Sequence, residues 1–163
     1  MSHEKEQAPL LELYLTYDQW KEKHDSLYAR LMELCRCMRW NPSNYECANW
    51  ESHHRLVRAT FIPFMEEWKK YVQQEKLTIY PFAKASIRGD ESSPVTPLEE
   101  DDRLVTLFYE HYVRAYEEGA TPEDSLARVM QVLLIVTEHF RIEDETILPI
   151  TEKLMEDLAY SGS

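Results

Sequence analysis

Apolar side chains recur every three or four residues along most of this 163-residue chain, which is the spacing of one face of an α-helix. The predicted helices cover residues 11–38, 49–87, 96–118 and 121–158. Their connections are mostly short, so neighbouring helices are expected to run antiparallel. The pattern predicts an all-α, up-down-up-down antiparallel four-helix bundle over residues 11–158, preceded by a polar N-terminal tail over residues 1–10. A non-bundle all-α arrangement is the alternative, and Pro63 predicts a kink or an early break in the second helix.

Turn and capping residues separate the predicted helices. Asn41-Pro42-Ser43-Asn44 is a turn-forming cluster, and Gly89–Pro97 is rich in turn residues and free of periodicity. Thr96-Pro97-Leu98-Glu99 predicts a helix start with an N-cap threonine and a capping-box glutamate. Gly119 favours the left-handed geometry of a helix end, and Thr121-Pro122-Glu123-Asp124 is a second start signal.

The last helix carries a histidine and a carboxylate inside its apolar stripe. His139 and Glu143 are four residues apart, so they share one face with Cβ atoms roughly 5–6 Å apart and can reach one metal ion. The same stripe contains Val129, Val132, Val136 and Ile147. A buried ionisable group needs a partner, so the pair predicts polar groups on the facing helices. The alternative is a hydrogen-bonded core histidine with a glutamate at the solvent edge.

An internal repeat extends this pattern to the second helix. Residues 71–81 and 139–149 carry Glu, Thr, Ile and Pro at the same offsets. Glu75 therefore matches Glu143, whereas Tyr71 occupies the position that corresponds to a histidine in the later segment. The repeat predicts that the two segments contribute to one polar layer of the bundle.

The first and third helices each carry one histidine on the predicted apolar stripe, namely His24 and His111. Other polar groups have structural interpretations. His53 and His54 are expected at a solvated helix start, and the acidic run over residues 99–102 is expected to complement the helix dipole.

Composition narrows the class of protein. The formal net charge of −12 opposes approach to nucleic acids and anionic membrane surfaces. The cysteines Cys35, Cys37 and Cys47 lack zinc-site spacing and are odd in number, which is typical of reduced thiols. No signal peptide or membrane-spanning segment is expected, and these features together predict a cytoplasmic location.

The order of these polar residues is similar to the hemerythrin-like (HHE cation-binding) family, whose pattern is H…HxxxE…H…HxxxE. The matching positions are His24, Tyr71, Glu75, His111, His139 and Glu143. The similarity covers nearly the whole chain, and the segments Glu22–Leu27 and Glu143–Pro149 look like that family's first-ligand and last-ligand segments. The resemblance implies a four-helix bundle in which these six residues hold two bridged irons.

Tyr71 departs from the family pattern, and two interpretations follow. In the first, its phenolate ligates a ferric ion, because a nearby cation lowers the pKa of a phenol. In the second, Tyr71 is a core aromatic, and the site holds one metal or none.

The predicted function is that of a non-haem iron protein that holds one or two irons, oxo-bridged where there are two, with manganese less favoured. It would bind or sense O2 or NO, or handle iron or peroxide, and the pattern does not distinguish an enzyme from a binding protein. The alternative is a metal-free helical-bundle regulator that acts by protein-protein contact, since Phe140–Asp144 and Leu77–Tyr80 also resemble Rsd-type anti-sigma regulators. Its acidic surface would meet a basic partner. The sequence pattern is compatible with either a monomer or a homodimer.

Overall fold

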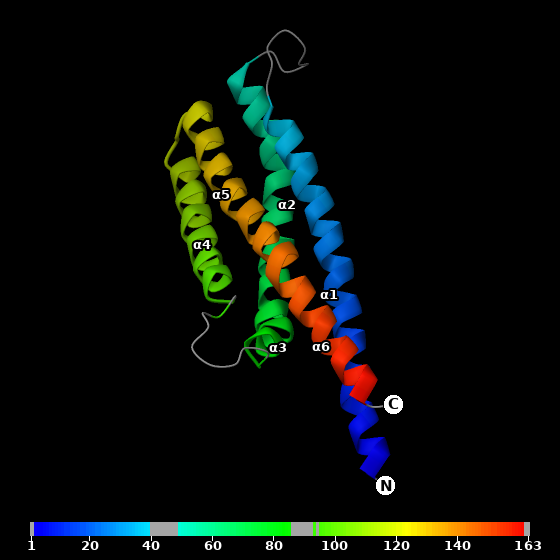
Figure 1. Cartoon of the computed structure of the whole chain (residues 1–163). Helices are drawn as coiled ribbons and strands as arrows, with labels where there is room; N and C mark the ends of the chain where they lie inside the picture. The colour runs from blue at the N-terminus through cyan, green and yellow to red at the C-terminus, as the bar shows by residue number, and fades with distance from the viewer. Residues whose placement is uncertain (1, 40–48, 86–92, 94, 162–163) are drawn as a thin grey trace.

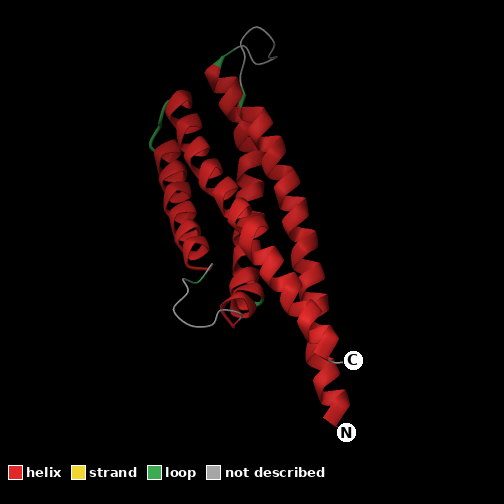
Figure 2. Ribbon diagram, in the orientation of Figure 1, coloured by secondary structure: helices red, strands yellow, loops and turns green. Residues whose placement is uncertain are grey.

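The computed structural model describes residues 2–39, 49–85, 93 and 95–161. Its elements are α1 (Ser2–Met38), α2 (Trp50–Leu77), α3 (Ile79–Ala85), α4 (Val95–Glu117), α5 (Pro122–Ile142), the π-helix η1 (Glu143–Ile147) and α6 (Leu148–Ser161). Every element in this part of the chain is helical (Figure 2), which confirms the all-α class. Within the described ranges, no helix combines the length and the apolar character needed to cross a membrane.

Two helix pairs form the body of the molecule. α1 packs along α2, and α4 packs along α5 (Figure 1). α5, η1 and α6 follow one another as one long rod that also contacts α1, while α6 lies against α3. The core is therefore enclosed between the rod, α1 and α2, and α4 covers one side of it.

Two predictions about helix ends are corrected. α1 begins at Ser2, so residues 2–10, predicted as a tail, are helical, because this segment is rich in strong helix formers. α2 contains Pro63 in its interior, so the early break, one of the two outcomes predicted there, does not occur. It ends instead at Leu77, where Thr78 serves as its C-cap.

The internal repeat corresponds to two matching irregularities in the backbone. The hydroxyl of Thr78 donates to the carbonyl of Gln74, and the hydroxyl of Thr146 donates to the carbonyl of Ile142, each at 2.5 Å. At the first position α2 ends, and at the second the chain widens into a π-helix, in which Leu148 N–H donates to the carbonyl of Glu143. Each repeat has a proline two residues after its Ile, and proline cannot donate a helical hydrogen bond. The helix accommodates this loss by ending or by widening.

The remaining helix ends follow their capping residues. Asn49 caps α2 through Ser52 N–H at 2.8 Å, and Thr121 caps α5 through Asp124 N–H at 3.2 Å. α4 begins slightly earlier than predicted, because Val95 N–H donates to Ser93 Oγ at 3.2 Å. Gly119 has a φ of +86° just after α4, as predicted. The turn at Asn41–Asn44 and most of the linker at Gly89–Pro97 lie outside the described residues.

The predicted apolar stripes of α1, α2 and α5 are buried, but that of α4 is rotated by about one residue. The buried residues of α4 are Val95, Leu98, Asp102, Val105, Tyr109 and Tyr112. The predicted stripe contained His111, which is exposed, as is Leu107 one turn before it. A stripe displaced by one residue faces about 100° away on an α-helix, so this difference changes which polar residue of α4 enters the core.

Candidate metal centre

Three helical segments bring the polar layer together. α2 supplies Glu75 near its C-terminal end, α5 supplies His139, and Glu143 is the first residue of the π-helix. All three side chains are fully buried, with 0% exposure. π-helical turns occur often at functional sites, and this one immediately follows the histidine that shares a face with Glu143.

The three side chains converge at a single point. His139 Nε2 lies 3.0 Å from Glu75 Oε1 and 2.6 Å from Glu143 Oε1. Each residue offers one donor atom, and the three donor atoms all lie within 4.8 Å of one another. Glu143 Oε1 has no aligned hydrogen bond despite its burial. A single ring N–H cannot satisfy two carboxylate oxygens equally well, so the arrangement resembles a set of donors around a cation.

The electrostatics of the cluster indicate a need for positive charge. Burial, with Glu143 beside it, raises the pKa of Glu75 well above its usual range. Burial also opposes the ionisation of Glu143, but His139 holds its pKa below the usual value. For His139, burial favours the neutral ring, yet the two carboxylates raise its pKa well above the usual value. In these states the cluster carries a proton on Glu75 and a second one on His139.

A divalent cation fits the same charge requirement. With Glu75 neutral, His139 cationic and Glu143 anionic, these three side chains carry no net charge. Two ionised carboxylates and a neutral imidazole around a divalent cation are neutral as well. Ligands of metal ions bind in these deprotonated forms, so one such ion replaces the two protons without a change of net charge. The donor set therefore fits a cation.

Two aromatic side chains hold the outer oxygens of the carboxylates. Tyr71 Oη donates to Glu143 Oε2 at 2.7 Å, and Trp20 Nε1 donates to Glu75 Oε2 at 3.1 Å. Burial, with Glu143 and Glu75 nearby, raises the pKa of Tyr71 well above its usual value. Tyr71 is thus a protonated hydrogen-bond donor inside the core, and its oxygen is bonded to a carboxylate of the cluster.

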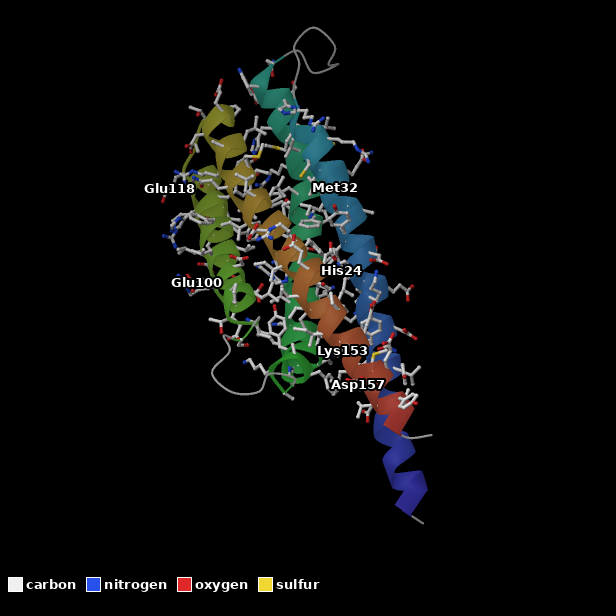
Figure 3. All side chains as sticks on the ribbon, viewed as in Figure 1. His24, Met32, Glu100, Glu118, Lys153 and Asp157 are labelled. Carbon is white, nitrogen blue, oxygen red and sulfur yellow. The ribbon has the colours of Figure 1, made fainter. Side chains whose placement is uncertain are left out.

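His24 borders the cluster from α1. Its Nε2 lies 3.0 Å from Asp144 Oδ1 and 3.6 Å from Glu143 Oε2, and its Nδ1 lies 2.9 Å from Asp25 Oδ1. Figure 3 shows His24 where α1 passes the rod that contains η1. The sequence-based placement of His24 beside Glu143 is consistent with this position, although the ring also faces two further carboxylates.

The expected position of His111 in the polar layer is wrong. Its side chain is exposed on α4, and its ring packs beside Phe108 with centroids 6.4 Å apart. The structure brings Asp102 to the cluster instead. Asp102 Oδ1 lies 3.1 Å from His139 Nδ1, without the alignment of a hydrogen bond, and Asp102 Oδ2 accepts from Tyr80 Oη at 3.2 Å. The rotated stripe of α4 is the physical reason for this exchange.

Asp102 is the main residue that the sequence analysis missed. It belongs to an acidic run in the first turns of α4, where carboxylates complement the helix dipole. The signal that identifies it is its spacing from Leu98, Val105 and Tyr109, because these four residues form one helical face. The sequence pattern assigns no polar role to Trp20 or Tyr80, yet their N–H and O–H groups donate to Glu75 and Asp102.

His53 and His54 are also not where they were expected. Both are buried at the start of α2 rather than solvated. His54 Nε2 lies 2.8 Å from Tyr112 Oη, and Arg58 Nη1 donates to the same hydroxyl at 3.1 Å. His54 is seventeen residues from Tyr71, or about 25 Å along the helix. His54 therefore belongs to a separate polar contact between α2 and α4.

No family model, curated protein or solved structure matches this chain.

Proposed function

We propose that this chain is a hemerythrin-like, non-haem iron-binding protein, and that Glu75, His139 and Glu143 hold one iron per chain. The observation that carries the proposal is the convergence of three fully buried donor atoms within 4.8 Å of one another. Two carboxylates and an imidazole are hard or borderline ligands, which suit iron and also manganese. Iron is preferred because of the family resemblance of the motif.

The proposed architecture is an up-down-up-down antiparallel four-helix bundle. Its support is the packing of α1 on α2 and of α4 on α5, together with the capped turn between α4 and α5. In Figure 1 the C-terminal end of α1 lies near the N-terminal end of α2, and the C-terminal end of α4 lies near the N-terminal end of α5. This topology would place the repeat segments of α2 and the α5–η1 rod at the same level. We place the protein in the cytoplasm, in keeping with the thiols of Cys35 and Cys37, which form no disulfide among the described residues.

The surrounding residues would keep the donors in position. Trp20 and Tyr71 each bind the outer oxygen of one carboxylate, so the inner oxygens stay directed toward the centre. Asp102 faces Nδ1 of His139 and would hold the ring proton there, which leaves the lone pair of Nε2 for the ion. Tyr71 would act through its hydrogen bond to Glu143 rather than as a ligand. A bound iron would supply the capacity to bind O2 or NO or to reduce peroxide.

A small cleft borders the residues that support the centre, and none of the three donor residues lines it. A cleft of about 80 Å³ between α1 and α2 is lined by residues that include Trp20, Lys23, Tyr71 and Gln74. It reaches the two aromatic side chains that bind the outer carboxylate oxygens. A molecule of the size of O2, NO or peroxide fits this volume, whereas a drug-sized ligand needs a pocket of roughly 300 Å³ or more.

Metal analysis of paired histidine variants tests the proposal. The chain is reconstituted anaerobically with Fe(II), desalted, and analysed for iron by mass spectrometry. We expect one iron per chain, loss of iron in His139→Ala, and full retention in the matched control His111→Ala, because His111 is exposed. Absence of iron from the reconstituted native chain, or equal loss in both variants, contradicts the proposed centre.

The metal-free regulator remains the alternative function. The neutral protonated state of the cluster allows the bundle to fold without a metal, and the net charge of −12 suits a basic protein partner. A metal-free chain that captures a stoichiometric partner from host lysate would favour this function. Sedimentation of the purified chain would show whether it forms a homodimer.

A further inference from the structure

Three aromatic side chains follow one another from the buried cluster toward the surface. Tyr71 and Trp20 are stacked, with ring centroids 6.4 Å apart and planes inclined by 13°. The centroid of Tyr17 lies 6.0 Å from that of Trp20. Tyr17 is 7% exposed, and its hydroxyl reaches an exposed carboxylate on α6. The three rings are therefore neighbours in the order Tyr71 of α2, then Trp20 and Tyr17 of α1, and the Tyr17 hydroxyl reaches α6.

Each member of this series donates its only polar hydrogen to a glutamate. The pairs are Tyr71 Oη to Glu143 Oε2 at 2.7 Å, Trp20 Nε1 to Glu75 Oε2 at 3.1 Å, and Tyr17 Oη to Glu152 Oε1 at 2.7 Å. Tyrosine and tryptophan are the side chains most easily oxidised by one electron among the aromatic residues. A tyrosine that loses an electron also loses its phenolic proton, so a neighbouring acceptor is a requirement for reversible oxidation.

We propose that Tyr71, Trp20 and Tyr17 form a path for one-electron transfer between the buried cluster and the surface. Electron tunnelling falls off exponentially with distance, so two short steps between neighbouring rings are faster than one long step. The inference goes beyond the proposed function, and its decisive test needs no bound metal. Where peroxide is reduced at the cluster, the path would carry the oxidising equivalent outward and so protect the buried residues.

The steps balance for an oxidant derived from peroxide reduction at the cluster. Tyr71 gives one electron to that oxidant and its phenolic proton to Glu143. Trp20 then returns an electron to Tyr71, which regains its proton from Glu143, and the oxidised indole of Trp20 keeps its proton in the hydrogen bond to Glu75. Tyr17 finally reduces Trp20 and gives its own proton to Glu152. The net result is one electron moved inward, one proton on Glu152 and a neutral tyrosyl radical at Tyr17.

Aromatic packing alone does not explain this series, since Trp68 provides a comparison within the same core. Trp68 lies 5.8 Å from Tyr71 and 4.7 Å from His139, and it is as deeply buried as Tyr71. Nevertheless, its indole N–H has no carboxylate acceptor among the described residues. The carboxylate partners therefore distinguish the path from its aromatic surroundings.

Laser photoionisation of the metal-free, full-length chain tests the path, because it produces tryptophanyl radicals at buried and exposed indoles alike. Transient absorption then follows the conversion of tryptophanyl into tyrosyl radical. All proteins carry Trp68→Phe, which removes the second indole beside Tyr71. Trp20→Phe is compared with the control Trp50→Phe, since Trp50 is 41% exposed at the start of α2.

We expect a fast, concentration-independent growth of tyrosyl radical that is retained in Trp50→Phe and lost in Trp20→Phe. Glu152→Gln changes an exposed residue, so it tests the path without disturbing the core. It should slow the growth of the radical, whereas Glu156→Gln, one turn further along α6, should not. The proposal is overturned if Trp20→Phe behaves like Trp50→Phe, or if Glu152→Gln behaves like Glu156→Gln. Neither result depends on iron, so failure of iron binding is detected separately by metal analysis.

Discussion

Tyr71→Phe isolates the hydrogen bond that connects α2 to Glu143. The substitution keeps the ring, which packs against Trp20 and Phe140, and removes only the hydroxyl. In the metal-free chain the contact of Glu143 Oε2 with His24 Nε2, at 3.6 Å, is too long to replace this hydrogen bond. A hydrogen bond to a charged group contributes about 1.5–3 kcal/mol, and loss of one partner leaves the other desolvated. We expect Tyr71→Phe to lower the free energy of unfolding by about 2 kcal/mol.

Urea unfolding at neutral pH, with a chelator present, measures this loss. Burial raises the pKa of Tyr71, so its hydroxyl stays protonated throughout the neutral range. The denaturant slope should not change, because no additional surface is buried or exposed. Tyr109→Phe is the matched control. Tyr109 is buried on α4, and its hydroxyl makes no side-chain hydrogen bond among the described residues. Equal effects of the two substitutions would refute the assigned role of Tyr71.

Three further predictions follow from other contacts. Asp102→Ala should weaken iron binding about 10–100-fold in a metal titration, because it removes the group that faces His139 Nδ1, and a native affinity would contradict this role. Burial, helped by Arg58, lowers the pKa of His54, so the unfolded chain binds more protons and stability falls as the pH drops below about 6.5. In His54→Gln, urea unfolding at about pH 7.5 and pH 5.5 should show a smaller fall, and an unchanged fall would exclude His54 as its source. Gly119→Ala should cost about 1–2 kcal/mol in thermal or urea unfolding, because the φ of +86° strains any residue with a Cβ.

The residues that the second and the last predicted helices contribute to the centre were predictable from the sequence. Glu75, His139 and Glu143 interrupt long apolar stripes, and the repeat placed the two glutamates at the same offset. Large apolar residues precede and follow each polar position on these stripes, so only one face of the helix can be the buried one. The structure accordingly brings these three residues together.

The third helix shows why the remaining part was not predictable. α4 contains two overlapping faces with helical spacing, one through Leu104 and His111 and one through Leu98, Asp102 and Tyr109. Hydrophobicity alone favours the first face, because it carries leucines and no carboxylate. The structure buries the second, in which the phenol of Tyr80 and the ring of His139 contact Asp102. Contacts with residues of other helices determine which face of α4 is buried. Such contacts cannot be read from the spacing of apolar residues within α4 alone.

The same cluster can be neutralised by two protons or by one divalent ion, and this equivalence bears on both proposed functions. A buried pair of carboxylates without compensation would destabilise the bundle by several kcal/mol. His139 and the proton on Glu75 remove that cost in the metal-free chain, while Tyr71 and Trp20 satisfy the outer oxygens in either state. The fold should therefore persist when the metal is withdrawn, unlike a domain whose structure is assembled by its ion. For this chain, metal content rather than foldedness separates an iron protein from a metal-free regulator.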